Sequence, residues 1–275
     1  MNEYFGKKII LNGYIQTADL FDNSLIYEGD SVYEVIRMTN GCPVFFHDHI
    51  ERLYNSVKQQ QKELLADIDV LRKAIISLIR SDKKKEANIK IVFNYNKGVK
   101  NWLVYFIEPM YPSSEQYKKG VKGILFRAMR KDPESKVVNH KLRSEIYHRL
   151  ILEGAYEALL VNENNLITEG SRSNIFFVIG KTLSTAPDNL ILNGITRKHI
   201  LEICASENIS VEMKCVSSDD PDKYNSVFMT GTSPTILPFC CIGDKLFDVE
   251  LPLLERLRKL YMARAEESMI RFRSE

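Results

Sequence analysis

The order of strand-like and helical segments is the feature that most constrains the fold of this chain. Residues 32–38, VYEVIRM, alternate in polarity and are rich in β-branched and aromatic side chains, which indicates a strand. The turn at 39–41, TNG, and the apolar residues 43–46, PVFF, predict a hairpin with a return strand. From His47 onward the apolar residues recur with helical spacing. A second helix is predicted over 69–79, and further strands over 8–13, 89–95 and 102–108.

A polar stretch divides this pattern into two halves. Residues 110–120, MYPSSEQYKKG, lack periodicity and contain a proline and a glycine, which is typical of a linker. We therefore predict a small N-terminal domain over 1–110, an interdomain linker over 111–120 and a large C-terminal domain over 121–275. The second half again mixes strands with helices, so the expected fold class is α+β. Its predicted strands are 121–130, 157–162, 174–179 and 226–230, and its predicted helices are 144–153, 195–207 and 251–268.

Charge and cysteine content argue against several classes of protein. Lys and Arg number 38 against 36 Asp and Glu, a formal charge of +2, so we expect neither a nucleic-acid partner nor a membrane surface. The five cysteines form no C-x-x-C motif and no metal-ligand spacing with the five histidines. We therefore expect no metal site and a reducing, cytoplasmic location. No apolar run has the length of a membrane-spanning helix.

Two short motifs indicate a site for a polar ligand. In residues 166–178, LITEGSRSNIFFV, Glu169 stands beside a glycine and hydroxyl residues directly before an apolar strand. A carboxylate at that position suits a polar ligand better than a hydrophobic core. In residues 194–198, GITRK, a glycine precedes the helix predicted over 195–207. The backbone amides at such a helix start attract phosphate.

One lysine upstream supplies a chemical reason for both motifs. Lys141 lies in KVVNHKLRSE, where two valines suggest the partly buried end of a strand entering a turn. A single lysine is usually a surface residue. However, a nucleophilic lysine, an acid and a phosphate site are the three elements that pyridoxal 5'-phosphate needs together. The lysine binds the aldehyde, the acid keeps the pyridine ring protonated, and the amides hold the phosphate. This combination predicts an enzyme that uses pyridoxal 5'-phosphate.

Five blocks along the chain carry a resemblance to a known family. They are EGDSVYEVIRMTNGCPVFFHDHIERLYNS (28–56), NHKLRS, EALLVNENNLITEGSRSNIFFV, ILNGITRKHILEIC and FMTGTSPTILP. Their order resembles class IV aminotransferases, the fold-type IV pyridoxal phosphate enzymes, which include branched-chain and D-amino acid aminotransferases and aminodeoxychorismate lyase. The resemblance implies a small α/β sandwich-like N-terminal domain and a larger barrel-like C-terminal domain that binds the cofactor. It also implies a homodimer whose site is completed across the subunit interface.

The resemblance implies roles for individual residues as well. Lys141 would bind the cofactor covalently and later move the substrate proton. Glu169 would pair with the pyridine nitrogen, and Arg52, in HIERL, would bind the phosphate. Contacts to the cofactor are also implied for Ser171, Ser173, Ile195, Thr196 and Thr232. Taken alone, such residues are also explained by a solvated helix face, a helix cap or a turn.

The sequence departs from the family at the spacing and at the substrate site. Lys141 and Glu169 are 28 residues apart, a few fewer than the family's spacing, as if one helical turn were missing. The D-amino acid enzymes carry an Arg-x-His pair at the end of the strand at 89–95, where this chain has Asn-Tyr-Asn at 94–96. A substrate carboxylate would need another partner, for which we name Arg37, Arg143, Arg172 or backbone amides. Tyr33 and Tyr147 are further candidates for substrate contact, although Tyr33 is equally explained as a core aromatic.

Three hypotheses follow for the activity. The first is a pyridoxal phosphate-dependent aminotransferase that acts on a small amino acid, of the branched-chain or D-amino acid type, with a 2-oxo acid. The second is a lyase of the aminodeoxychorismate type that releases pyruvate. Both reactions share the cofactor and the loss of the substrate Cα proton, so the cofactor motifs do not separate them. The third is a non-catalytic binding protein, against which the presence of both Lys141 and Glu169 argues.

Overall fold

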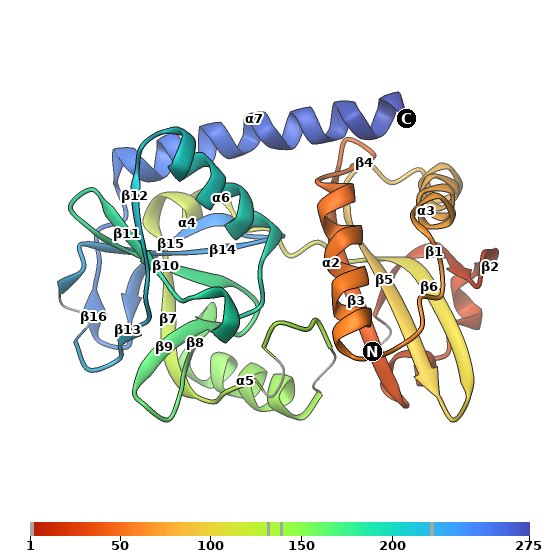
Figure 1. The fold of residues 1–275 in the computed structure, drawn as a ribbon, viewed down its shortest axis with the longest axis horizontal. Helices are drawn as coiled ribbons and strands as arrows, with labels where there is room; N and C mark the ends of the chain where they lie inside the picture. Colours follow the sequence, from red (N-terminus) through yellow and green to blue (C-terminus); the bar gives the residue numbers. More distant parts are fainter. Residues whose placement is uncertain (1–2, 131–132, 138–139, 221–222) are drawn as a thin grey trace. The chain divides into compact units, whose positions relative to one another are not determined.

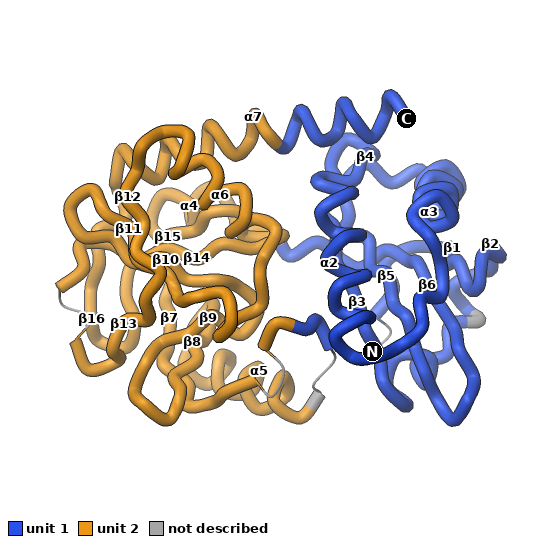
Figure 2. The backbone as a smooth tube through the Cα atoms, in the orientation of Figure 1, with its two compact units in different colours: residues 1–110, 135–138, 265–275 blue, residues 111–134, 139–264 orange. Residues whose placement is uncertain are grey.

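The chain divides into two compact units in a computed structural model that describes residues 3–130, 133–137, 140–220 and 223–275 (Figures 1 and 2). Unit 1 comprises residues 1–110, 135–138 and 265–275. Unit 2 comprises residues 111–134 and 139–264. Most of unit 1 therefore coincides with the predicted small domain. The structure adds to it a short segment at 135–138 and the end of the C-terminal helix α7 (Pro252–Ser274).

Unit 1 is built on an antiparallel six-stranded sheet with the order β2-β1-β6-β5-β3-β4. Its strands are β1 (Tyr4–Leu11), β2 (Tyr14–Thr17), β3 (Asp30–Thr39), β4 (Cys42–Pro43), β5 (Ala87–Asn96) and β6 (Val99–Ile107). Its helices are η1 (Ala18–Leu20), α1 (Ser24–Tyr27), α2 (Phe46–Gln59) and α3 (Ile68–Asp82). Successive side chains of a strand point to opposite faces. On β3, Glu34 contacts α2, whereas Tyr33 packs into a core on the other face with Ile9, Val92 and Leu103.

The return strand predicted over 43–46 is wrong for most of its length. Only Cys42 and Pro43 pair with β3, and Phe45 adopts a left-handed backbone conformation with φ 53° directly before α2. Phe46 is buried in the first turn of α2 and packs edge-to-face on Phe272 of α7. The apolar residues that resemble a strand therefore bury the start of a helix, because periodicity cannot distinguish these uses in so short a run.

Unit 2 is built on a mixed ten-stranded sheet with the order β12-β11-β10-β14-β15-β7-β8-β9-β13, to which β16 adds beside β15. The strands are β7 (Val121–Arg127), β8 (Glu157–Val161), β9 (Leu166–Gly170), β10 (Asn174–Ile179), β11 (Thr182–Thr185), β12 (Ser210–Met213), β13 (Val216–Ser217), β14 (Ser226–Gly231), β15 (Thr235–Ile242) and β16 (Lys245–Leu246). The helices are α4 (Ser114–Lys119), α5 (His140–Glu153), η2 (Asp188–Leu190), α6 (Ile195–Ser206) and most of α7.

Residues 111–120, predicted as a linker, contain the short helix α4. The helix begins with a capping box: Ser113 Oγ accepts from the Gln116 backbone amide, and Gln116 Oε1 accepts from the Ser113 backbone amide. Tyr117 packs on the core of unit 2 and donates from its hydroxyl to the Pro234 carbonyl at 3.0 Å. The stretch is therefore part of unit 2. Among the described helices, none is long and apolar enough to cross a membrane.

Candidate active site

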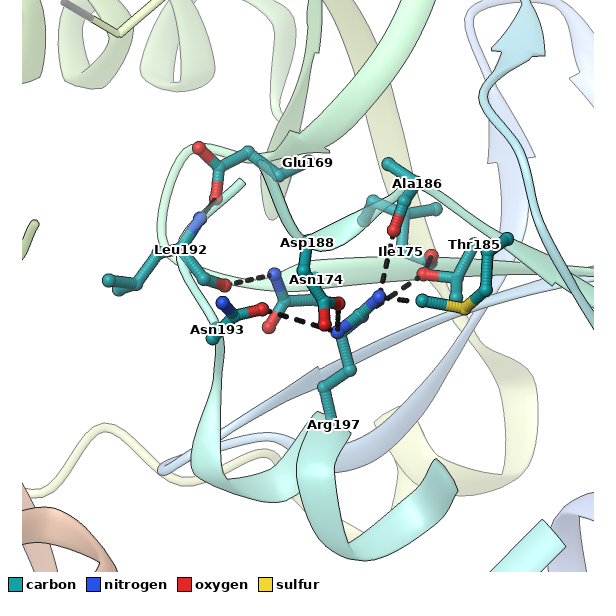
Figure 3. A network of polar contacts seen from close by, with 10 residues as sticks. Glu169, Asn174, Ile175, Thr185, Ala186, Asp188, Leu192, Asn193 and Arg197 are labelled. Atoms are coloured by element: carbon teal, nitrogen blue, oxygen red, sulfur yellow. Dashed lines mark hydrogen bonds and ion pairs between the residues drawn. The ribbon is translucent and has the colours of Figure 1, made fainter. Parts of the chain in front are cut away.

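Glu169 and the start of α6 are joined directly in unit 2 (Figure 3). The Leu192 amide donates to Glu169 Oε2 at 3.1 Å. Asn174, at the start of β10, donates from Nδ2 to the Leu192 carbonyl at 2.8 Å. Glu169 and Leu192 are 23 residues apart in the sequence, so this bond brings the end of β9 beside the segment that leads into α6.

The N-terminus of α6 has no side-chain cap. Gly194 occupies the N-cap position, where a Cβ would lie 2.1 Å from Asn174 Oδ1, so only glycine fits without movement. The amides of the first helical turn, at Ile195 and Thr196, receive no capping side chain and are suited to an anion. The Thr196 hydroxyl is buried and lies 3.3 Å from the hydroxyl of Tyr261.

Arg197 fixes this helix start in place (Figure 3). Its buried guanidinium donates from Nη1 to Asp188 Oδ1 at 2.7 Å and from Nη2 to the Ala186 carbonyl at 2.8 Å. Burial lowers the pKa of Arg197, and the ion pair with Asp188 opposes that effect. Because its donors are directed at protein groups beside η2, Arg197 positions the first turn of α6, a role that the sequence analysis did not assign.

Glu169 is a buried carboxylate that accepts from two different segments of unit 2. Its side chain is 4% exposed; besides the Leu192 amide, Arg130 Nη1 lies 3.4 Å from its Oε1. Both donors stabilise the charged carboxylate. A carboxylate oxygen can accept more than one hydrogen bond, so Glu169 retains the capacity to accept an N–H from a ligand. Arg130 was missed from sequence, since nothing in its local pattern connects it to a residue 39 positions later.

A second buried carboxylate, Glu157, shapes the loop after Glu169. Its oxygens accept from the Ser171 amide at 3.1 Å, the Ser171 hydroxyl at 2.5 Å, the Arg172 amide at 3.3 Å and the Ser173 hydroxyl at 2.9 Å. The hydroxyls of Ser171 and Ser173 therefore hold the loop, and their predicted contact with a cofactor ring stays a prediction. Glu157 was not predicted as a site residue. The available signal was a charged residue at the start of the apolar strand EALLV, which is buried throughout.

Thr232 lies half-buried in the turn between β14 and β15. This is the turn position that the sequence analysis considered for it as the alternative to a phosphate contact.

Arg52, in unit 1, is held by a carboxylate of its own unit. It forms a bidentate ion pair with Glu34, from Nε to Oε2 at 2.8 Å and from Nη2 to Oε1 at 2.6 Å. His49 Nδ1 lies 3.2 Å from Glu34 Oε1 without the alignment of a hydrogen bond. Burial raises the pKa of Glu34, but the charge of Arg52, the largest opposing cause, contributes to a net lowering, so the carboxyl group stays ionised far below its ordinary range. The predicted phosphate contact of Arg52 stays a prediction.

The candidates for substrate contact are divided between the two units. Tyr33 is buried in the core of unit 1, and the half-buried Arg37 lies on the same face of β3. Arg143 and Tyr147 are exposed on α5. Arg172 is exposed beside the loop that follows β9, with Nη2 donating to the Tyr156 carbonyl at 3.2 Å. Two of the five candidates thus belong to unit 1 and three to unit 2.

Lys141 differs from its expected setting. It is exposed in the first turn of α5, not at a partly buried strand end. Of the two valines that suggested a strand, Val137 forms an isolated antiparallel bridge with Val32 and Val138 lies outside the described residues. A second lysine in the same segment, Lys136, lies within unit 1.

Known proteins match this chain over most of its length. A family model described as "Amino-transferase class IV" matches residues 31–242, well over half of the sequence. A D-alanine aminotransferase from Bacillus licheniformis is 27% identical over 256 residues, covering 86% of this chain and 89% of the relative. An aminodeoxychorismate lyase from Bacillus subtilis is 25% identical over 257 residues, covering 86% and 87%.

Solved structures share the fold. A branched-chain amino acid aminotransferase from T.th. with pyridoxamine 5'-phosphate superposes with a TM-score of 0.84 at 24% identity, over 96% of this chain and 95% of that one. The expected fold-type IV architecture is thereby confirmed. With the family model spanning both units, the chain belongs to the class IV aminotransferase family.

Proposed function

We propose that this protein is a pyridoxal 5'-phosphate-dependent aminotransferase that transfers an amino group from a small amino acid to a 2-oxo acid. One observation in the structure carries the proposal most strongly. The buried Glu169 is hydrogen-bonded to the segment that leads into the uncapped N-terminus of α6. Unit 2 thus offers, close together, an acceptor for a ring N–H and donors for a phosphate.

The residues present fit this cofactor. When bound, it supplies an aldehyde for a lysine and a ring that withdraws electrons from the substrate Cα. Glu169 would hold a proton on the ring nitrogen, with Arg130 keeping the carboxylate charged. The amides of Ile195 and Thr196 and the hydroxyl of Thr232 would bind the phosphate, and Arg52 would add a guanidinium. Ser171 and Ser173 would lie beside the ring.

The protein's own contribution to the reaction is proton transfer and orientation. A lysine amine, once released by the incoming amino acid, would take the Cα proton and return it to the cofactor. Glu169 makes that proton more acidic by keeping the ring protonated. The ion pair of Arg197 with Asp188 holds the helix start that orients the phosphate. Hydrogen bonds within unit 2 hold both Glu169 and the start of α6 in place.

The substrate is proposed as a branched-chain or D-amino acid. The end of β5 argues against a D-amino acid carboxylate binding there. Asn94 is buried and donates to the Glu28 carbonyl at 2.7 Å and to Ser31 Oγ at 2.9 Å, and the Tyr95 hydroxyl donates to the Glu63 carbonyl. These side chains support the sheet. A lyase that releases pyruvate from aminodeoxychorismate is the alternative, favoured by the similarity to the Bacillus subtilis lyase over most of both chains.

The test begins with the purified protein and added pyridoxal 5'-phosphate. We expect a visible absorption band that a lysine-bound cofactor produces and that bleaches when the correct amino acid is added. Branched-chain L-amino acids and D-alanine are supplied one at a time, and pyruvate is measured after aminodeoxychorismate. Pyruvate from aminodeoxychorismate without bleaching by any amino acid would replace the aminotransferase proposal with the lyase.

Glu169→Gln tests the role of the acid. It should leave the band in place and slow the bleaching by roughly a hundredfold or more, because a neutral amide cannot hold the ring proton. Equal rates in Glu169→Gln and wild type would contradict the role given to this residue.

We also propose that the active protein is a cytoplasmic homodimer that needs no nucleic acid or membrane. All five cysteines are free thiols, which suits a reducing compartment. Sedimentation at assay concentration tests the assembly, and full activity in a monomeric fraction would contradict it.

A further inference from the structure

We propose that Lys136, and not Lys141, is the lysine that binds pyridoxal 5'-phosphate covalently. The inference rests on the aminotransferase function proposed above and assigns a residue within that site. It arises from the contacts that hold residues 135–137 within unit 1, whose partners lie 76 to 105 residues earlier in the sequence.

The backbone of Lys136 is fixed on both sides. Its carbonyl accepts from the Tyr33 amide at 3.1 Å, and its amide donates to Ser56 Oγ at 3.3 Å. The neighbouring Ser135 donates from its hydroxyl to Gln59 Oε1 at 2.8 Å, and Val137 bridges to Val32. Residues 135–137 therefore lie along the edge of β3 and against α2, so that the origin of the Lys136 side chain is well defined.

This position places Lys136 close to the candidate phosphate ligand. Ser56 follows Arg52 by four positions on α2, which is one helical turn. The charge of Lys136 also acts on the residues around Arg52. Burial is the largest cause of the lowered pKa of His49, and the positive charges of Arg52 and Lys136 both lower it further. A covalent lysine and a phosphate ligand must both reach one cofactor molecule, and these two residues belong to the same compact unit.

The surroundings of the Lys136 ammonium suit a nucleophile. The residue is half-buried, and its Nζ lies 5.0 Å from the centre of the Tyr33 ring. The Nζ of Lys90 lies 5.3 Å from the same ring. A lysine with the ordinary pKa of about 10.4 has a free amine in about one molecule in a thousand at pH 7.4. Nucleophilic lysines are activated by an apolar setting or a neighbouring cation. Half-burial beside the Tyr33 ring supplies the apolar setting for Lys136, whereas the charge of Lys90 is paired with Glu3. Lys141, in contrast, is exposed in the first turn of α5.

The sequence spacing agrees with this assignment. Lys136 precedes Glu169 by 33 residues, whereas Lys141 precedes it by 28. The gap of 28 residues is shorter than the family's spacing and would require the loss of about one helical turn. With Lys136 the departure disappears, and the helix α5, with 14 residues, needs no deletion. The proposed step is a condensation in which the neutral Lys136 amine attacks the aldehyde carbon. A C=N bond replaces the C=O bond, the oxygen leaves as water, and no oxidant or reductant is involved.

Chemical trapping of the holoenzyme decides between the two lysines. Sodium borohydride reduces the C=N bond and makes the attachment permanent. Cleavage after glutamate then releases residues 135–145, a peptide that contains both lysines, and fragmentation in the mass spectrometer locates the pyridoxyl group. The same measurement is made on Lys136→Arg and on the matched variant Lys141→Arg, each of which keeps its charge. Circular dichroism and thermal melting confirm that both variants fold.

We expect the pyridoxyl group on Lys136, loss of the adduct and of the visible band in Lys136→Arg, and both retained in Lys141→Arg. An adduct on Lys141, lost in Lys141→Arg only, would overturn this inference and leave the proposed function standing. A folded wild type with neither band nor adduct at saturating cofactor would instead overturn the proposed function.

Discussion

The hydrogen bonds to Glu157 should make the cofactor loop depend on a single buried carboxylate. This residue is 2% exposed, and its two oxygens accept from the amides of Ala158, Ser171 and Arg172 and from the hydroxyls of Ser171 and Ser173. We choose Glu157→Gln as the perturbation because it keeps the shape of the side chain. It removes the charge and turns one of the two acceptor atoms into a donor.

The magnitude follows from this arrangement. If the amide oxygen takes the place of Oε1, the new NH₂ group faces the Ser173 hydroxyl, which can accept from it, and the Arg172 amide, which loses its acceptor at a cost of about 1–3 kcal/mol. The three remaining bonds change from charge-assisted to neutral and lose roughly 1 kcal/mol each. Removal of a buried charge regains part of this total. We therefore expect a net loss of about 2–3 kcal/mol in the local stability of the loop.

Hydrogen exchange is the appropriate assay, because the single tryptophan, Trp102, lies on β6 of unit 1 and does not report on unit 2. A loss of about 2–3 kcal/mol accelerates exchange of amides in 166–178 by about 30- to 150-fold. Glu163→Gln is the matched control, since Glu163 is exposed in the turn between β8 and β9. If both variants exchange at the wild-type rate, the proposed role of Glu157 in holding the loop is refuted.

Three further predictions concern other contacts. Gly194→Ala should lower the melting temperature, because its Cβ would lie 2.1 Å from Asn174 Oδ1. In the double variant with Asn174→Ala, much of the melting-temperature loss caused by Gly194→Ala should disappear, whereas additive losses would argue against the clash. Burial is the largest cause of the lowered pKa of His49, so the native state favours neutral histidine. The contribution of neutral His49 to the free energy of unfolding should be fully present above pH 6.5, the ordinary pKa of histidine, and should fall as the pH drops below it. His49→Gln should therefore flatten the dependence of the unfolding free energy on pH between about pH 6.5 and 5, and an unchanged dependence would contradict this. Arg52→Lys should weaken cofactor binding about tenfold or more in an absorbance titration, since lysine cannot make the bidentate pair with Glu34, and an unchanged dissociation constant would exclude Arg52 as a phosphate ligand.

Local patterns were sufficient where a segment is long and periodic. The helix predicted over 69–79 is α3, and the strands predicted over 89–95 and 102–108 lie within β5 and β6. Short segments failed, because a few apolar residues suit a strand or a buried helix start equally well. That ambiguity explains why residues 43–46 were assigned to a strand although Phe45 is the N-cap residue of α2 and Phe46 its first residue.

The candidate site divides in the same way. Glu169 and the GIT segment stand out from sequence, because a carboxylate and a glycine at the ends of apolar segments are locally unusual. Glu157, Arg130 and Arg197 did not stand out, since each acts on a partner that only folding brings near.

Sequence alone determined the cofactor class and the family, because the residue types that hold a phosphate and a pyridine ring recur as short motifs in a set order. The tertiary structure decided which charged groups meet. It joined Glu169 to the start of α6 through Leu192, and it separated the exposed Lys141 from the half-buried Lys136 five residues before it. The physical reason is that reactivity of a lysine depends on burial and neighbouring charge, and both are set by contacts between residues far apart in the chain.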